Sequence, residues 1–373
     1  MEPTGTAPPD PDQLSIFGEP PAAPARGRTR RSTKSDAPIR PARTRLAMPA
    51  ALQPYRSLLR LGTSSWSFAG WQGLVYDDPG APYAESRLSR EGLPAYASHP
   101  LLTAAGIDRG FYAAVPVADH VHYASQVPPG FRFLVKAPGS VTDALRRDDS
   151  GRGVEPNAAW LDAPLAIGQF VEPAVAGLGD ALGTLLFQFS PMPASVLADV
   201  PGWVETLRRF LRAMPRALPE GAGYAVELRD PALLTPRLMD MLREEGVGYC
   251  LGLHDRMPPI GRQLRALDRL EDGAPGPLVA RWSLHAGIGY EQARKRYAPF
   301  RDLVDPDPAI REPLAERAAA ALLAGRPVTV IANNKAEGSA PLTLAALADA
   351  IAAKLPAAAS RAAEPPGGTG RDD

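Results

Sequence analysis

Eight short apolar segments of the chain end on a polar or charged residue, and a stretch able to form a helix follows each one. They comprise residues 59–64, 107–112, 131–136, 184–189, 224–229, 247–255, 278–285 and 328–334. The links between them are longer than a hairpin needs, which favours parallel strands joined by helices. Since eight strand-then-helix units build a (β/α)8 barrel, the pattern predicts an α/β fold of the TIM type.

Four of the links carry explicit helix signals, because each begins at a proline and then places apolar residues at helical spacing. They are residues 201–214, 231–246, 308–325 and 341–355. Two links, 139–183 and 285–327, are longer than one helix requires. In a barrel such loops follow the strands on the catalytic face, so we expect them to form walls of a site there.

The composition indicates the size of the folded part and of its extensions. The chain has 373 residues, no net charge and 45% hydrophobic residues, which suits one barrel of about 250–300 residues with tails. Residues 1–50 are rich in proline, alanine and arginine. The sequence therefore predicts a disordered tail over residues 1–50, a barrel over residues 56–355 and a second disordered tail over residues 356–373.

The single cysteine, Cys250, has no partner in the chain for a disulfide, which fits a reducing compartment. No apolar stretch approaches the ~20 residues that span a bilayer, and the N-terminus lacks the basic-then-apolar order of a secretory signal. We therefore expect a cytoplasmic protein with no membrane partner, in which Cys250 is a small buried residue.

Alternation along one predicted strand brings two charged residues onto the same face. Side chains two positions apart point the same way, so Glu227 and Arg229 point together. One interpretation is an ion pair in which each residue satisfies the other, since neither charge is tolerated alone in a core. The other is functional: Glu227 serves as general base or metal ligand, and Arg229 holds an anionic group. Both interpretations stay open at this point.

Other predicted strands also end in residues able to bind a substrate or a metal. The same alternation puts Arg281, Ser283 and His285 on one face. Further polar residues at strand ends are Lys136, Gln188, His254, Asp255, Asn333 and Asn334. The two histidines, with Asp255 and Glu227, would suit a divalent metal, although no compact metal motif accompanies them. No glycine-rich phosphate loop, dinucleotide motif or nucleophile elbow occurs, so the sequence names no organic cofactor.

Short motifs within these segments follow one another in a recognisable order. They are residues 62–67, the pair Phe111-Tyr112, residues 129–138, 185–189 and 225–229, the pair Leu284-His285, and the pair Asn333-Asn334 with Gly338. In this order they resemble the domain of unknown function 72 family, also called YecE-like proteins, over about residues 59–355. The resemblance implies a TIM-type barrel. It implies no reaction, because the activity, substrate and cofactors of the family are not established.

The motif positions that carry over are Thr63, Ser64, Trp66, Tyr112, Lys136, Gln188, Glu227, Arg229, His285 and Asn334. The chain departs from the family pattern at two places. Gly106-Ile107-Asp108 stands where the family has Glu-Ile-Asn. Ser283 stands where the family has an arginine, and the nearest arginine is Arg281. With one acid lost and one base displaced, the chemistry of the family need not carry over unchanged.

The favoured function is an enzyme, of the hydrolase or phosphoesterase kind, acting at the barrel mouth on a phosphorylated sugar or a nucleic acid. The catalytic candidates are Glu227 as general base, His285 as acid or metal ligand, and Lys136 beside the substrate anion. The substrate-binding candidates are Ser64, Trp66, Tyr112, Gln188, Arg229, Arg281, Asn333 and Asn334. The choice of substrate rests on analogy with other barrels.

An apolar island in the N-terminal tail supports an alternative function. Residues Gln13-Leu14-Ser15-Ile16-Phe17 resemble the short peptide by which bacterial DNA polymerases and repair proteins bind the sliding clamp. The basic residues that follow would be attracted to DNA phosphates. The alternative is a non-catalytic, DNA-associated protein tethered to the clamp through Gln13, Leu14, Ile16 and Phe17. In it, Tyr290 and Tyr297 would contact a DNA strand.

We predict that the bacterial sliding clamp captures the full chain in a pulldown and that Leu14→Ala/Phe17→Ala abolishes the capture. The reason is that the leucine and phenylalanine of such a peptide dock into an apolar groove. Thr29→Ala/Thr33→Ala, which alters the same tail outside the motif, is expected to leave recovery unchanged. Equal recovery of the wild type and the Leu14/Phe17 variant would rule out the clamp motif.

Overall fold

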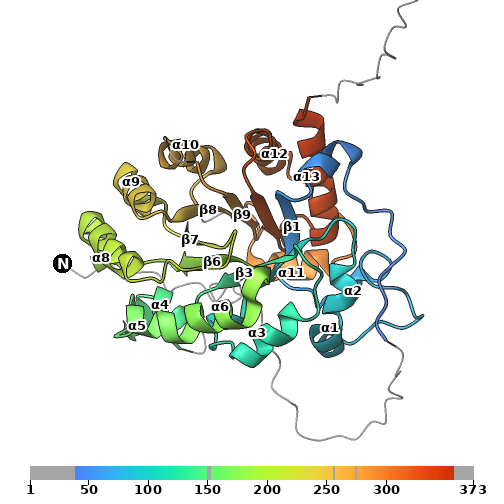
Figure 1. Cartoon of the computed structure of the whole chain (residues 1–373), viewed down its shortest axis with the longest axis horizontal. Helices are drawn as coiled ribbons and strands as arrows, with labels where there is room; N and C mark the ends of the chain where they lie inside the picture. Colours follow the sequence, from blue (N-terminus) through green and yellow to red (C-terminus); the bar gives the residue numbers. More distant parts are fainter. Residues whose placement is uncertain (1–37, 149–152, 255–256, 274, 357–373) are drawn as a thin grey trace, which may run out of the picture.

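The computed structural model describes residues 38–148, 153–254, 257–273 and 275–356. Within them, eight strands close into a barrel in the order β1-β10-β9-β8-β7-β6-β3-β2, and every neighbouring pair is parallel. The strands are β1 (Leu59–Thr63), β2 (Ala104–Ile107), β3 (Arg132–Lys136), β6 (Leu182–Phe189), β7 (Gly223–Leu228), β8 (Gly248–Leu253), β9 (Leu278–Trp282) and β10 (Val328–Ala332). Helices surround this barrel (Figure 1), which confirms the predicted TIM-type architecture.

The α-helices form the outer layer of the fold. They are α1 (Glu85–Glu91), α2 (Leu93–Ala97), α3 (Val117–Ala124), α4 (Gly139–Thr142), α5 (Ala163–Ala166), α6 (Glu172–Leu178), α7 (Ala194–Leu197), α8 (Val200–Arg212), α9 (Pro236–Glu244), α10 (Ile260–Leu270), α11 (Tyr290–Tyr297), α12 (Pro308–Leu323) and α13 (Ala340–Lys354). Among the described residues, no helix has both the length and the apolar character needed to cross a membrane.

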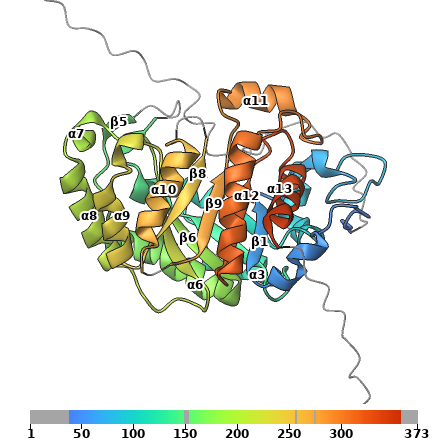
Figure 2. The same ribbon diagram turned by 90° about the horizontal axis from the view of Figure 1, so that it is seen from above.

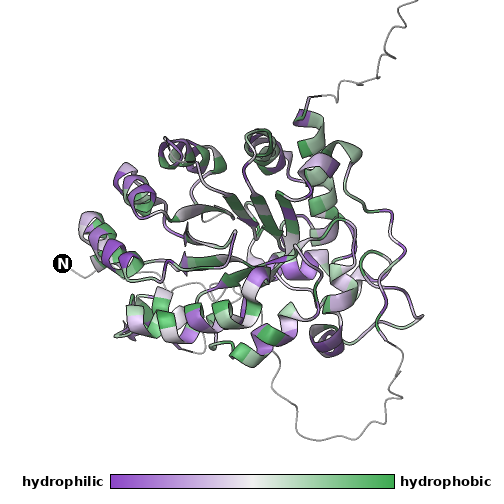
Figure 3. Cartoon of the chain, in the orientation of Figure 1, coloured by the Kyte–Doolittle hydropathy of each residue, from purple (hydrophilic) through white to green (hydrophobic). Residues whose placement is uncertain are grey.

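Helix α8 shows how the sequence pattern produces this layer. One face of the helix is buried and includes Trp203, Leu207 and Phe210. At its start the Asp199 carboxylate accepts the Gly202 N–H at 2.9 Å, which satisfies a donor that the first turn leaves without a helical partner. Figure 3 shows the same division across the fold: the strands are mostly hydrophobic, and the outer faces of α8, α9 and α10 are mostly hydrophilic.

Three of the four predicted helices, now α8, α12 and α13, lie within two residues of their predicted bounds. The fourth begins later than predicted, because Pro231–Leu233 form a separate short turn and α9 starts only at Pro236. Thr235 is extended, and its hydroxyl accepts the Leu238 N–H at 3.3 Å. The residue before a proline disfavours helical backbone, so one helix does not run through this position.

The position of the second strand corrects another predicted element. The strand spans Ala104–Ile107, three residues before the predicted segment 107–112, in which Arg109–Phe111 form a short 3-10 helix. Strands β1 and β2 approach so closely that a Cβ on Gly62 would overlap the carbonyl oxygen of Ala104. Hydrophobic bulk is therefore a poor marker of this strand, where close packing favours small residues.

The two long links place extra elements beyond the strand ends. After β3 the chain forms an antiparallel hairpin of β4 (Leu145–Arg147) and β5 (Gly153–Pro156) before α5 and α6. After β9 it forms α11 before α12. Figure 2 shows β5 and α11 at the same end of the molecule. Since both follow a strand, this is the end at which the active sites of TIM-type barrels lie.

Part of the N-terminal stretch that was predicted to be disordered packs against the barrel. The Ala42 N–H donates to the Val75 carbonyl at 2.9 Å, and Met48 is buried. The packed part of the chain therefore begins before the predicted start of the barrel. The clamp-like motif at residues 13–17 and the C-terminal residues 357–373 lie outside the described residues.

We predict that Gly62→Ala lowers the free energy of unfolding by about 1–3 kcal/mol, the usual range for forcing a methyl group into a packed core. Gly223→Ala is the matched control, because an added Cβ on this strand glycine meets no heavy atom within 4 Å. It is expected to be neutral or to stabilise by up to ~1 kcal/mol through a lower entropy of the unfolded chain. Urea denaturation measures both, and equal effects would contradict the close approach of β1 and β2.

Candidate active site

The inside of the barrel is apolar in one layer and polar in the next. Seven buried side chains, from seven different strands, form an apolar cluster of their own: Ala104, Leu134, Leu186, Ala225, Cys250, Val279 and Ile331. Because side chains two positions apart share a strand face, the next inward positions toward the carboxyl ends follow directly. We call them the upper layer, and they are Gly106, Lys136, Gln188, Glu227, Gly252, Arg281 and Asn333. Charged and polar groups thus lie above an apolar floor.

Glu227 is the fully buried carboxylate of the upper layer. Its Oε2 accepts a hydrogen bond from Nη1 of Arg281 at 2.9 Å, and its Oε1 lies 3.4 Å from Nη2 of Arg229. The side-chain oxygen of Gln188 accepts from the same two guanidinium groups, at 2.9 Å from Arg229 and 3.2 Å from Arg281. One carboxylate and one amide therefore orient two arginines inside the barrel.

Asp108 joins this cluster, although the sequence did not place it among the candidate residues. Nη2 of Arg281 donates to Oδ2 of Asp108 at 2.7 Å. Asp108 lies two positions after Gly106, so it follows the inward face of β2 just beyond the end of that strand. Correct placement of β2 would have revealed it. Asp108 and Arg281 belong to the two places at which the chain departs from the family motif. In the folded chain these two residues form an ion pair.

Lys136 ends β3 and is only 1% exposed. Its Nζ lies 3.9 Å from the centre of the Phe111 ring. Burial lowers the pKa of Lys136 well below its ordinary range, because the ammonium form loses hydration. The Asp108 carboxylate opposes this shift in pKa, whereas the guanidinium groups of Arg281 and Arg229 add to it. Lys136 therefore loses its proton far more readily than an exposed lysine.

The pKa of Glu227 is lowered as well, which has the opposite chemical meaning. Burial alone would raise the pKa of this carboxyl, but Arg281 and Arg229 outweigh the burial and hold it below its usual value. Glu227 therefore stays ionised while Lys136 tends toward the neutral amine. In many active sites, neighbouring groups whose pKa values are shifted differently divide the acid and base roles between them.

Two other predicted residues, Ser64 and Asn333, meet at the edge of the upper layer. The Asn333 amide donates to the Ser64 hydroxyl at 2.8 Å. A Cβ on Gly106 would lie 3.1 Å from the Cα of Ser64, so the glycine leaves room for this contact. Asn334 is fully buried and its oxygen accepts from the Trp71 indole at 3.1 Å and the Ala340 N–H at 2.9 Å. Asn334 thus supports the start of α13.

Trp66 and His285 form hydrogen bonds outside the charged cluster, whereas Tyr112 is near it: burial raises the pKa of Tyr112, and Tyr290 and Asp108 add to this shift. The Trp66 indole donates to the Ser89 carbonyl at 3.2 Å, and its ring packs edge-on against Tyr123 of α3. Tyr112 is 39% exposed. Strand β9 ends at Trp282, so the alternation that would direct His285 inward does not continue, and its Nδ1 lies 2.8 Å from the Ala286 carbonyl oxygen.

A metal site is not evident in the described part of the chain. There, no three or more histidine, cysteine, aspartate or glutamate side chains gather closely enough to hold a metal ion. Among the proposed ligands, His254 is buried at the end of β8, and Asp255 lies outside the described residues.

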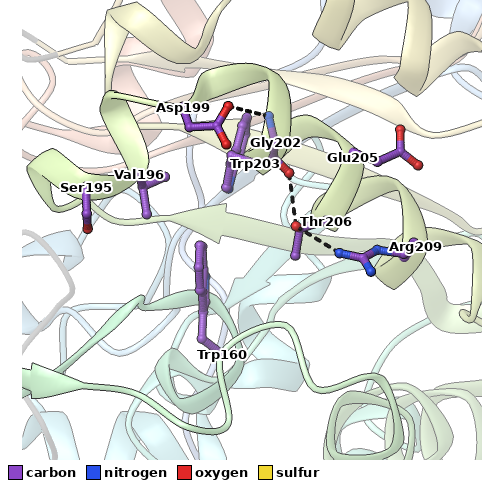
Figure 4. A pocket seen from close by; sticks show the side chains of 9 residues that line it. All are labelled: Trp160, Ser195, Val196, Asp199, Gly202, Trp203, Glu205, Thr206 and Arg209. Carbon is purple, nitrogen blue, oxygen red and sulfur yellow. Dashed lines mark hydrogen bonds between the residues drawn. The ribbon is translucent and has the colours of Figure 1, made fainter.

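A hollow of about 580 Å³ lies on the outside of the barrel, beside α7 and α8. Its walls include Trp160, Trp203, Asp199 and Arg209, as Figure 4 shows. The exposed Arg209 donates to the Thr206 hydroxyl at 3.2 Å. None of the predicted site residues lines this hollow, so it offers a control position for tests of the barrel interior.

The fold and the upper layer define a TIM-type α/β barrel that holds a buried charged cluster at its strand ends. The chain belongs to the family described as protein of unknown function DUF72, whose model matches residues 60–367. No functionally curated protein matches the chain.

Two crystal structures of DUF72 family proteins resemble this chain. The one from Enterococcus faecalis V583 is 19% identical, covers 79% of this chain and 95% of its own, and has a TM-score of 0.51. The one from Thermotoga maritima MSB8 is 18% identical, covers 78% of this chain and 98% of its own, and has a TM-score of 0.47. At this level of identity the Enterococcus protein shows a shared fold and nothing about the reaction.

We predict that Lys136 makes stability rise with pH in the alkaline range. Between its lowered pKa and the ordinary value of 10.5, the unfolded chain binds a proton that the folded chain lacks, so raising the pH favours folding. Lys136→Met is expected to remove this part of the slope in urea denaturation at a series of pH values. The exposed Lys295→Met is expected to keep the wild-type slope. Identical slopes for wild type and Lys136→Met would contradict the lowered pKa.

Proposed function

We propose that this protein is an enzyme that binds a small anionic substrate, of the phosphorylated sugar or nucleic-acid class, at the mouth of its barrel. The observation that carries the proposal is the charged cluster of Lys136, Arg229, Arg281, Glu227 and Asp108 at the strand ends. Strand ends of this kind carry the catalytic residues of TIM-type enzymes.

Stability alone does not account for this cluster. The interior of a TIM-type barrel is usually filled by apolar side chains, as it is in the layer below. Replacing a buried ion pair with apolar residues of similar volume is often neutral or stabilising. Apolar residues at these positions would therefore stabilise the barrel at least as much as the charged residues do. This supports a chemical role for the charges.

The balance of charge favours an anion as the ligand. Among the described residues, and with Lys136 protonated, the cluster contains three cations and two carboxylates, Glu227 and Asp108. A bound anion would neutralise the excess positive charge. Arg229 and Arg281 would hold it, because a guanidinium group presents two parallel N–H donors to a phosphate or carboxylate. Glu227 would orient the two arginines, and Lys136 would transfer protons.

The DNA-associated alternative has less support from the fold. Tyr290 and Tyr297 are both buried, and the Tyr297 hydroxyl donates to Asp305 at 2.7 Å, so neither ring is free to stack on a base. The exposed Arg294 and Lys295 of α11 would supply phosphate contacts only. The clamp-binding tail remains a separate proposal that does not depend on the barrel.

We predict that sulfate, used as a phosphate-like probe, binds the barrel and raises its melting temperature. Arg229→Lys keeps the charge but loses the planar fork, so the sulfate affinity should fall about tenfold, which corresponds to one charge-assisted hydrogen bond. Arg209→Lys in the outer hollow is the matched control and should leave affinity unchanged. Isothermal titration calorimetry measures the sulfate affinity of both variants.

The pH dependence of the same titration provides a second check. Sulfate keeps one charge state over the neutral and alkaline range, so changes in affinity report on the protein. Affinity should weaken as the pH rises through the lowered pKa of Lys136, because the cluster then loses its excess positive charge. Absence of sulfate binding, or equal loss in the Arg229 and Arg209 variants, would overturn the anion site.

A further inference from the structure

The geometry of the cluster gives Lys136 a more specific role than binding an anion. We propose that its amine condenses with the carbonyl group of an anionic aldehyde or ketone, forming an imine inside the barrel. This inference rests on the proposed anion site, since Arg229 and Arg281 would hold the phosphate or carboxylate of the same molecule.

The surroundings of Lys136 match the physical conditions for such a lysine. An amine attacks a carbonyl only in its neutral form, and enzymes produce that form by removing water or by placing another cation nearby. Both conditions hold here, because Lys136 is 1% exposed and shares the barrel interior with two guanidinium groups. The direction of its pKa shift agrees with this geometry.

The cluster also holds a group that is able to relay the protons of this reaction. Asp108 is the carboxylate that acts most strongly on Lys136, and Arg281 occupies its Oδ2. Its Oδ1 is buried and accepts no hydrogen bond within the described residues. In the proposed reaction this oxygen takes up protons from the attacking nitrogen and returns them to the departing oxygen.

The steps balance without an external oxidant or reductant. The nitrogen lone pair of Lys136 forms a bond to the carbonyl carbon as the carbon–oxygen π bond breaks. Asp108 takes one proton from the nitrogen and passes it to that oxygen, which gives a carbinolamine. Asp108 then takes the second nitrogen proton and delivers it to the hydroxyl group. The carbon–oxygen bond then breaks, water leaves, and a carbon–nitrogen double bond remains. In its protonated form this imine restores one positive charge beside the bound anion.

Phe111 controls access to the amine. Its ring lies over Nζ, and Gly139 packs behind it, since a Cβ there would lie 3.0 Å from the ring. A ring face attracts an ammonium group, so Phe111 favours the protonated form of Lys136 and covers it. Phe111→Leu is therefore expected to increase the reactivity of the amine, an effect that a purely structural role would not produce.

Another buried lysine provides a matched control. Lys335 is 5% exposed, and its Nζ lies 4.1 Å from the centre of the Tyr290 ring, much as Lys136 lies over Phe111. Arg281 and Arg229 both lower the pKa of Lys136 beyond the effect of its burial. Burial over an aromatic ring is thus common to both lysines, whereas the paired guanidinium groups distinguish Lys136.

The experiment is reductive trapping of the full-length protein with sodium borohydride. The probes are glyceraldehyde 3-phosphate, pyruvate and uncharged glyceraldehyde, and peptide mass mapping locates the adduct. We expect one of the anionic probes to label Lys136 about tenfold more than Lys335, because the guanidinium groups that would hold the anion lie beside Lys136. Labelling should increase with pH, increase in Phe111→Leu and disappear in Lys136→Met. Preference between the two anionic probes identifies the phosphate or the carboxylate as the group that is held.

The outcomes separate this inference from the proposed function. Sulfate binding without an adduct at Lys136 from either anionic probe would overturn the imine and leave the anion site standing. Absence of both sulfate binding and adduct would overturn both. Equal labelling of Lys136 and Lys335, or equal labelling by the charged and uncharged aldehydes, would also overturn the imine proposal.

Discussion

The buried ion pair between Glu227 and Arg281 holds the upper layer of the barrel together. It joins β7 to β9 across the interior at 2.9 Å, and Arg229, Gln188 and Asp108 all bond to one of its two members. Removing one partner of a buried pair typically costs about 3–5 kcal/mol, because the other charge is left without compensation. The proposed roles of Arg229, Gln188 and Asp108 therefore depend on this pair being intact.

The layer below and the glycines beside the pair make this arrangement possible. The apolar floor excludes water from one side, so the charges interact more strongly than they would in solution. A Cβ on Gly252 would overlap the end of the Met257 side chain and lie 3.3 Å from Cγ of Glu227. Small residues at such positions preserve space around the carboxylate that larger side chains would fill.

Much of this site was accessible from the sequence, because alternation along a strand is a local property. The face shared by Glu227 and Arg229, and the inward positions of Lys136, Gln188 and Arg281, follow from strand position alone. Alternation did not predict the direction of the His285 side chain, which lies beyond the end of β9, or of the Trp66 side chain, which packs against α3. Alternation still holds one residue beyond a strand, as it does for Arg229 and Asp108, but it no longer determines the direction of a side chain three residues beyond the end of β9.

Periodicity in the chain was sufficient to specify a TIM-type barrel, since strand and helix patterns depend on neighbouring residues and recur eight times. Barrel closure was needed to identify the contacts inside it. Asp108 and Arg281 are 173 positions apart, and the small residues of β2 gave no hydrophobic signal for the strand that positions Asp108. Which strand ends meet across the axis depends on strand order and stagger, and these arise only when all eight strands pair.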